Sequence, residues 1–283
     1  MDRHQLGPYQ LTRNEKSNDL LLLVKGPTVY KAILDRALPA LQFSRTFPDR
    51  FGLFDWGTYI RGADSSHQAE LDRLCCLLQL AILIDDDLDE SFALSFHTQM
   101  APTGGYERTR IGQLVRIAKP YDRNHNSGDR VTAEKLASEL AQFISQHPTY
   151  RRADLITAVP PSNANKPFDL PIVLVQEIAK ITGITVAPTV AKSRKTRPMK
   201  ECRTVQEKVD NLSGVFSADC GVFGRRTVIL LDDIYETGFT INEVGRALKT
   251  AGATLVLGLV ATKTARDLSG EPARKEEEDD IPT

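Results

Sequence analysis

The run VILLDDIYETGFT, residues 228–240, places two adjacent carboxylates between an apolar stretch and a Thr-Gly-x-Thr turn. Asp232 and Asp233 can accept hydrogen bonds from the vicinal hydroxyls of a ribose, or share a Mg²⁺ ion with them. Gly238 permits positive φ and a close approach of a ligand to the backbone, while the two threonines of the turn supply hydroxyl donors. Together with the N-terminus of a following helix, these groups predict a site for a phosphorylated ribose.

Each part of this run also has a plain structural interpretation. Thr240 and Glu243 have the spacing of a capping box, in which case Thr240 only begins the helix. Asp232 and Asp233 are compatible with a solvated strand end. Because all the parts occur together directly after an apolar strand, we favour the phosphoribosyl site.

Alternating strand and helix patterns from about residue 132 onward must position this run. Helical spacing of apolar residues occupies 132–146, 170–181 and 240–251, and short apolar strand patterns occupy 153–159, 184–187, 227–231 and 254–261. Apolar strands that alternate with helices predict an α/β fold, a parallel sheet with helices on both faces. Ligands bind at the carboxyl ends of such strands, so the loops at 160–167, after 187 and at 232–240 are expected to meet there.

The run at 228–240 resembles the fingerprint of the type I phosphoribosyltransferases, in which apolar residues and an acidic pair precede a phosphate loop ending in Thr-Gly-x-Thr. The resemblance implies a catalytic role for Asp232 and Asp233, which contact the ribose hydroxyls of phosphoribosyl pyrophosphate and touch Mg²⁺ only indirectly, through those hydroxyls. The loop that binds the 5-phosphate is then Glu236, Thr237, Gly238, Phe239 and Thr240.

Tyr235 and Glu236 depart from the commonest form of this fingerprint. Purine-salvage members of the class often have an acid at the place of Glu236, near the base. Glu236 is therefore either a catalytic general base or a charge that repels the phosphate and lowers affinity.

The wider stretch 114–261 resembles the ComF-like, amidophosphoribosyltransferase-like branch of this class, without its N-terminal zinc module. The residues that carry this likeness are LVRIAKPY with Lys119, the strand end Ala158-Val159-Pro160, and the segment with Asn211, Gly214 and Phe216. ComF-like proteins are associated with DNA uptake, related domains accompany bacterial defence systems, and relatives are often dimers. The resemblance thus implies a homodimer, or a protein or nucleic-acid partner bound through residues 1–110.

Two further segments are implied to bind the leaving pyrophosphate. The first, the pyrophosphate loop, is Pro161, Ser162, Asn163, Asn165 and Lys166. It has no arginine and so lacks a bidentate fork, which predicts weaker pyrophosphate binding; an ordinary polar turn is the alternative. The second is the flexible basic loop with Lys192, Arg194, Lys195 and Arg197. It is equally compatible with a solvated basic surface or a nucleic-acid contact.

Length and charge limit the remaining possibilities. A chain of 283 residues is one large or two ordinary domains. With 36 basic against 37 acidic residues, a net charge of −1, it is no general nucleic-acid or membrane-surface binder. No apolar run is long enough to span a bilayer or act as a signal peptide, and the four cysteines form no disulfide framework or zinc spacing. A cytoplasmic protein with reduced thiols and no membrane contact is expected.

We expect three parts in the chain: a mixed α+β region over 1–110, serving as a hood or partner-binding region, a phosphoribosyltransferase-like core over 111–265, and an acidic, disordered tail over 266–283. The aromatic cluster at 41–59 either fills a core or forms a partner surface. A second acidic run, 85–90, follows the apolar LAILI but lacks Thr-Gly-x-Thr, so it is predicted to be a solvated loop.

Two functions remain open from the sequence. The leading hypothesis is a Mg²⁺-dependent phosphoribosyltransferase that uses phosphoribosyl pyrophosphate and a nucleobase or amine acceptor. The alternative is a catalytically weak or inactive module that binds a phosphoribosyl compound or nucleotide, as a sensor or accessory protein in DNA uptake or bacterial defence. The arginine-free pyrophosphate loop and the Tyr235-Glu236 pair favour the alternative.

Overall fold

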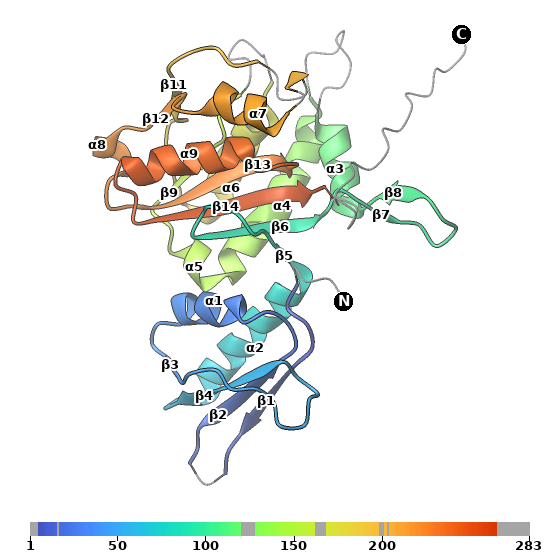
Figure 1. Cartoon of the computed structure of the whole chain (residues 1–283), viewed down its shortest axis with the longest axis vertical. Helices are drawn as coiled ribbons and strands as arrows, with labels where there is room; N and C mark the ends of the chain where they lie inside the picture. The colour runs from blue at the N-terminus through green and yellow to red at the C-terminus, as the bar shows by residue number, and fades with distance from the viewer. Residues whose placement is uncertain are drawn as a thin grey trace.

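The computed structural model describes residues 5–15, 17–119, 128–161, 168–197, 201–202 and 204–264. These residues form an antiparallel four-stranded sheet, a six-stranded sheet and two short two-stranded ribbons (Figure 1). None of the described helices has the length and apolar character needed to cross a membrane. The predicted tail over 266–283 and four residues of the pyrophosphate loop, Ser162, Asn163, Asn165 and Lys166, lie outside the described residues.

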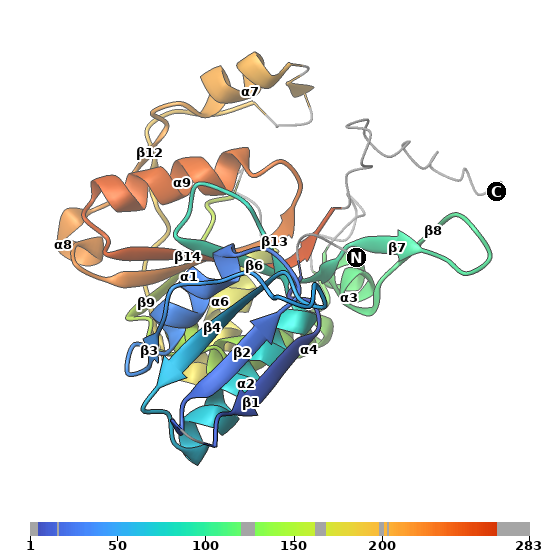
Figure 2. The same cartoon turned by 60° about the horizontal axis from the view of Figure 1, so that its bottom comes forward.

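A small antiparallel sheet backed by two helices forms the N-terminal module. Leu20, Leu22 and Val24 alternate with half-buried residues, so one face of the sheet is buried against the helices. Figure 2 shows the strands lying across the helices. The strand order is β1-β2-β4-β3. The elements are β1 (Tyr9–Arg13), β2 (Leu20–Val24), α1 (Val29–Ala37), β3 (Gln42–Phe43), β4 (Trp56–Arg61) and α2 (Ser65–Leu80).

The six-stranded sheet carries the strands predicted from the alternating pattern. Its order is β10-β9-β13-β14-β6-β5, and all neighbouring strands are parallel except the edge pair β6 and β5. The strands are β5 (Ile82–Leu83), β6 (Glu90–Phe96), β9 (Leu155–Ala158), β10 (Thr185–Val186), β13 (Thr227–Tyr235) and β14 (Leu255–Lys263).

Helices cover both faces of this sheet, which is why β13 and β14 are apolar on both sides. Ile229 and Leu231 belong to the hydrophobic core under α3, α4 and α6, whereas Val228 and Leu230 belong to the core under α9. The predicted α/β fold with a parallel sheet between helices is therefore confirmed. The helices are α3 (Arg110–Ala118), α4 (Arg130–Gln146), α5 (Pro148–Arg151), α6 (Leu170–Thr182) and α9 (Phe239–Thr250).

Two short ribbons and two short helices complete the described chain. They are β11 (Ala191–Lys192) paired with β12 (Phe216–Ser217), α7 (Val205–Leu212), α8 (Cys220–Phe223), and the ribbon of β7 (Thr98–Met100) and β8 (Tyr106–Arg108). The β7–β8 ribbon projects from the side of the molecule (Figure 1).

Residues 82–96 were expected in the N-terminal region, yet they form two strands of the main sheet. β6 pairs in parallel with β14, from Glu90 opposite Leu257 to Phe96 opposite Lys263. The reason is that Phe92 and Ala93 are completely buried in the sheet, although their short apolar run carries no clear pattern in the sequence. The sheet therefore begins before the expected boundary at residue 110.

The N-terminal module and the main sheet share one continuous hydrophobic core. The cluster that contains Leu22 and Leu74 of the module also contains Phe143 of α4 and Leu257 of β14. The aromatic cluster at 41–59 is partly core and partly surface. The side chain of Trp56 is 2% exposed and fills the core, whereas that of Phe51 is 86% exposed.

Candidate functional site

β13 delivers the predicted acidic pair to the carboxyl edge of the sheet. The strand continues through Asp232 and Asp233 to Tyr235, four residues beyond the predicted apolar stretch. Asp232 lies opposite Val260 of β14, and this pairing continues to Tyr235 opposite Lys263, so the pair lies within the paired strand rather than at a frayed end. Asp233 is buried, and its backbone N–H donates to Asp232 Oδ1 over 2.9 Å. The solvated strand end is therefore the wrong interpretation of this pair.

Lys119 supplies a positive charge to the acidic pair. Its Nζ lies 2.7 Å from Asp233 Oδ2, and Lys119 occupies the C-cap position of α3. The sequence pattern singled out this lysine but assigned it no partner, because 114 positions separate the two residues along the chain. The structure adds Lys119 to the site.

The surroundings of Asp232 disfavour the ionised form of its carboxyl group. Burial, with the neighbouring charge of Asp233 as the next cause, raises the pKa of Asp232 well above its ordinary value. Asp169, at the N-cap position of α6, also raises the pKa of Asp232 through its negative charge. Asp169 is thus a second site residue that the sequence did not single out. The oxygens of Asp232 and Asp233 lie side by side at this edge and can accept hydrogen bonds from paired ribose hydroxyls.

The predicted phosphate loop turns directly into the N-terminus of α9. Gly238 is the N-cap residue, with φ of 75°, and no side chain caps the helix within the described residues. The first N–H groups of α9 therefore point out of the helix end, where the dipole favours an anion. Thr240 lies inside the helix, so it does not begin α9 as the capping-box interpretation predicted.

The Tyr235 side chain packs against this loop at Gly238. A Cβ added to Gly238 would collide with the Tyr235 hydroxyl, so the ring lies directly over the glycine. The Tyr235 carbonyl accepts a hydrogen bond of 2.9 Å from the Thr264 backbone N–H, which ties the loop to the end of β14. Glu236 is exposed, while Thr237 and Phe239 are half-buried. Lys208 of α7 lies with its Nζ 5.9 Å from the centre of the Phe239 ring.

The basic segment meets the described end of the pyrophosphate loop at one residue. Lys192 Nζ donates a hydrogen bond of 2.7 Å to the Pro161 carbonyl, and it also lies over the ring of Phe216. Burial lowers the pKa of Lys192, and the charge of Asp169 acts in the opposite direction. The two segments predicted to bind pyrophosphate are therefore in direct contact at Lys192.

The other basic residues of this segment lie further along it. Arg194 donates to the Asp210 carbonyl over 2.9 Å, and the Arg197 backbone exchanges two hydrogen bonds with the Asn211 side chain. Lys195 is exposed. Arg194 and Arg197 are thus attached to α7.

The second acidic run is not the solvated loop that its sequence predicted. Asp85 and Asp87 are exposed, but Asp86 and Asp89 are half-buried and Glu90 is buried. Asp86 Oδ1 accepts hydrogen bonds from the Leu88 backbone and the Ser91 hydroxyl, and burial raises its pKa to about 6. Asp89 accepts from the Val256 N–H over 2.7 Å and is ion-paired with Lys249. The prediction was wrong because Asp86 bonds within its own turn and Asp89 bonds to distant parts of the chain.

Glu90 joins the N-terminal module to the main sheet. Its carboxylate is fully buried and lies 2.8 Å from Arg36 Nη1 of α1 and 3.3 Å from His147 Nε2. Burial raises the pKa of Glu90 to about 7 and lowers that of His147 to about 3. The second run therefore has a structural role that its local sequence does not reveal.

Comparisons with known proteins find similarity only among solved structures. No protein-family model matches the sequence, and no curated protein matches it. A glutamine phosphoribosylpyrophosphate amidotransferase from B. subtilis, complexed with ADP and GMP, has 15% identity and a TM-score of 0.37, over 86% of this chain and 46% of that chain. This chain thus spans less than half of that protein.

Two smaller proteins are similar over about half of this chain. A purine phosphoribosyltransferase from Pyrococcus horikoshii has 16% identity and a TM-score of 0.30, over 48% of this chain and 83% of that chain. A hypoxanthine phosphoribosyltransferase from Staphylococcus aureus has 14% identity and a TM-score of 0.32, over 53% of this chain and 77% of that chain. Likenesses this weak carry no argument about function, which depends on the site itself.

Proposed function

We propose that the chain binds phosphoribosyl pyrophosphate at the carboxyl edge of its six-stranded sheet and transfers the phosphoribosyl group to a nucleobase or amine. One observation carries the proposal: a buried strand delivers Asp232 and Asp233 directly before an uncapped helix N-terminus at Gly238. Ligands of parallel sheets bind at this edge, and an open helix N-terminus is an anion site.

Each group of the site has a role in this reaction. The N-terminal N–H groups of α9 and the hydroxyls of Thr237 and Thr240 hold the 5-phosphate. Asp232 and Asp233 hold the ribose hydroxyls. An acceptor nitrogen attacks C1, the bond from C1 to the pyrophosphate oxygen breaks, and pyrophosphate leaves with the bonding electrons. We assign to Glu236, whose side chain is exposed, the role of accepting the proton that the acceptor loses.

Mg²⁺ fits this site as a companion of the ligand. Among the residues that the structure describes, no group of three or more His, Cys, Asp or Glu side chains could hold a metal ion. Asp233 is ion-paired with Lys119, so this carboxylate already has a cationic partner. Asp232 and Asp233 would therefore reach the ion through the ribose hydroxyls. The bound ion would stabilise the charge of the departing pyrophosphate.

Binding without turnover is the second candidate function, and the pyrophosphate side of the site favours it. Lys192 is held by the Pro161 carbonyl, and Arg194 is held by α7. Asp169 adds negative charge near the same place. In this version the chain senses a nucleotide as a ComF-like accessory protein of the cytoplasm, in DNA uptake or bacterial defence, with its partner bound through residues 1–110.

Titration calorimetry with phosphoribosyl pyrophosphate, with and without Mg²⁺, tests the binding site. We expect Mg²⁺-dependent binding that Asp232→Asn with Asp233→Asn removes. The matched control is Asp85→Asn with Asp87→Asn, which removes the same charge from two exposed acids of the other run and should bind normally. Absence of binding to the unaltered chain would refute the proposal. Release of pyrophosphate with an acceptor supports the transferase, and binding without release supports the sensor.

A further inference from the structure

The two acids of the proposed site are held in different ways. The Asp232 carboxylate accepts a hydrogen bond from the Asp233 backbone N–H, so the strand itself orients it. The Asp233 carboxylate has its Oδ2 2.7 Å from Lys119 Nζ, in a residue 114 positions earlier in the chain. The orientation of one carboxylate is therefore set locally, whereas that of the other depends on a distant helix.

Helix α3 crosses the carboxyl ends of three strands. It begins beside the last residue of β6, where the Thr109 hydroxyl donates to the Phe96 carbonyl over 2.6 Å, and it ends at Lys119 beside Asp233 of β13. β14 lies between β6 and β13 in the sheet. Nine residues of helix extend about 13 Å and two strand spacings about 10 Å, so α3 has the length that this crossing requires.

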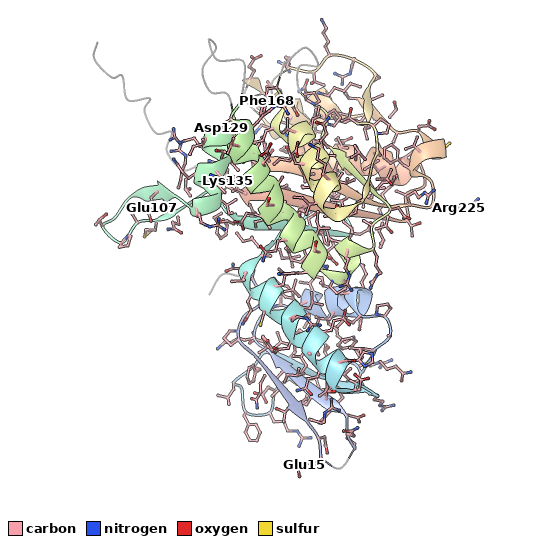
Figure 3. All side chains as sticks on the ribbon, turned by 180° about the vertical axis from the view of Figure 1, so that it is seen from behind. Glu15, Glu107, Asp129, Lys135, Phe168 and Arg225 are labelled. Atoms are coloured by element: carbon pink, nitrogen blue, oxygen red, sulfur yellow. The ribbon has the colours of Figure 1, made fainter. Side chains whose placement is uncertain are left out.

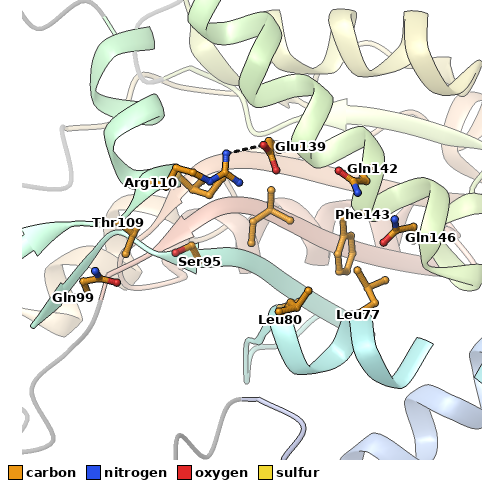
Figure 4. A pocket seen from close by; sticks show the side chains of 13 residues that line it. Leu77, Leu80, Ser95, Gln99, Thr109, Arg110, Glu139, Gln142, Phe143 and Gln146 are labelled. Atoms are coloured by element: carbon orange, nitrogen blue, oxygen red, sulfur yellow. Dashed lines mark hydrogen bonds and ion pairs between the residues drawn. The ribbon is translucent and has the colours of Figure 1, made fainter. Parts of the chain in front are cut away.

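Several contacts fix the start of α3. The Thr109 hydroxyl caps the helix by accepting from the Gly112 N–H over 3.0 Å. A Cβ added to Gly112 would collide with the His97 carbonyl, so the helix packs directly on the chain that follows β6. Figure 4 shows Arg110, in the first turn, ion-paired with Glu139 of α4 at 2.7 Å. The helix that carries Lys119 is therefore held in one place at its N-terminal end.

Negative charge gathers around the place proposed for the ribose. Burial raises the pKa of Asp232, the charges of Asp233 and Asp169 add to that rise, and the charge of Lys119 opposes it. A ligand that carries a phosphate and a pyrophosphate brings further negative charge to the same place. A cation paired with Asp233 therefore reduces repulsion in addition to fixing the carboxylate.

We propose that Lys119 is a positioning residue, which holds the Asp233 carboxylate in the orientation that accepts a ribose hydroxyl. This role depends on the phosphoribosyl site proposed above. A carboxylate has about four lone-pair positions on its two oxygens, so one cation on Oδ2 leaves positions for a ligand. Without Lys119 the carboxylate can rotate about its side-chain bonds, and ligand binding must then supply the entropy of fixing it. Lys119 thus acts through Asp233 and not on the phosphates of the ligand.

A double-mutant cycle of ligand binding tests this role, because the Lys119 side chain is 29% exposed and direct contact with the ligand is the alternative. Titration calorimetry with phosphoribosyl pyrophosphate and Mg²⁺ compares the unaltered chain, Lys119→Met, Asp233→Asn and the double variant. We expect each single variant to bind at least about tenfold more weakly. The double variant should bind within about threefold of Asp233→Asn, since the lysine then has no carboxylate to hold.

The outcomes of this cycle separate the role of Lys119 from the proposed function. Losses that multiply in the double variant would mean that Lys119 binds the ligand directly, and unchanged binding by Lys119→Met would mean that it has no role. Either result overturns the inference, while binding by the unaltered chain still supports the phosphoribosyl site. Absence of binding by the unaltered chain refutes the proposed function, and the role of Lys119 with it.

Three further variants guard against a loss of fold or a general effect of charge. Lys119→Arg keeps a cation at the end of α3 and should bind within about threefold of the unaltered chain. Lys119→Gln, which is neutral but still donates a hydrogen bond, takes the place of Lys119→Met in the cycle if circular dichroism shows that the methionine variant is unfolded. Lys135→Met is the matched control, on an exposed lysine of α4, the helix beside α3 (Figure 3), and should bind normally. Weak binding by Lys119→Arg or by Lys135→Met would contradict the inference.

Discussion

Asp232–Asp233 and the run Asp85–Glu90 both follow an apolar strand, yet only the first reaches the carboxyl edge of the parallel strands. β13 lies inside the sheet with a parallel strand on each side. β5 is an edge strand antiparallel to β6, so the run that joins them lies at the opposite, amino edge. Ligand sites of parallel sheets form at the carboxyl edge, which gives the two runs different environments.

The partners of the two runs differ accordingly. Asp86, Asp89 and Glu90 bond to β6, β14, α9 and α1, so their charges are used within the protein. Asp232 and Asp233 are followed by a glycine in the left-handed region and a helix end without a side-chain cap. Similar local sequences thus stabilise the fold at one edge of the sheet and form the proposed ligand site at the other.

Glu90→Ala should have the largest effect on stability. It removes a fully buried carboxylate and leaves the Arg36 guanidinium without its ion pair. Breaking a buried pair costs several kcal/mol, and because Arg36 is 30% exposed we expect about 3 kcal/mol of unfolding free energy to be lost. Urea denaturation measures the loss. Asp85→Ala, at an exposed position of the same run, should change stability by less than about 0.5 kcal/mol. A loss of less than about 0.5 kcal/mol for Glu90→Ala as well would show that the second run has no structural role.

His147→Phe should reveal a dependence of the unfolding free energy on pH that the opposite effect of His147 cancels in the unaltered chain. The raised pKa of Glu90 makes unfolding free energy fall as pH rises from 4.5 to about 7, because the folded state keeps a proton that the unfolded state releases. The lowered pKa of His147 acts oppositely between about 3 and 6.5, because only the unfolded state takes up the proton. Without His147, unfolding free energy should fall by on the order of 3 kcal/mol between pH 4.5 and 7.

Denaturation curves across this pH range measure that slope. The double variant Glu90→Gln, His147→Phe should show no slope from this pair. A slope that persists in the double variant would assign it to other groups.

Gly238→Ala should damage the phosphate loop more than a matched glycine change elsewhere. Gly183 ends α6 with φ of 76°, and Gly238 begins α9 with φ of 75°, so alanine at either position has the same backbone strain of about 1 kcal/mol. Only at Gly238 would the new Cβ strike the Tyr235 hydroxyl. We expect at least tenfold weaker binding of phosphoribosyl pyrophosphate for Gly238→Ala and unchanged binding for Gly183→Ala, by calorimetry. Equal binding by both variants would place the phosphate elsewhere.

Asp232→Asn should separate stability from binding. Burial disfavours the ionised form of Asp232, so an amide should keep or raise the unfolding free energy at pH 8, by up to about 1 kcal/mol. Ligand binding should nevertheless weaken at least tenfold, because the amide replaces one carboxylate oxygen, which accepts from a ribose hydroxyl, with an NH2 group that only donates. Denaturation and calorimetry on one preparation give both values. A loss of stability as large as that of Glu90→Ala would mean that Asp232, like Glu90, stabilises the fold.

Several features of this site can be predicted from the sequence because they depend on neighbours along the chain. The apolar stretch of β13, the positive φ of Gly238 and the helix after it follow from residues 228–251. Helix α6 and its glycine end follow in the same way. Contacts between distant residues could not be predicted, namely the Lys119–Asp233 ion pair, the Lys192–Pro161 hydrogen bond and the pairing of β6 with β14.

The sequence by itself determined the main strands and the three long helices in the second half of the chain, and which run could hold a phosphorylated ribose. Periodicity and turn chemistry are local, so they survive without knowledge of the fold. Only the tertiary structure decided that Asp232–Asp233 lies at the carboxyl edge and Asp85–Glu90 at the amino edge. Strand order and direction decide this, and they are set by the burial of residues that are far apart in the chain.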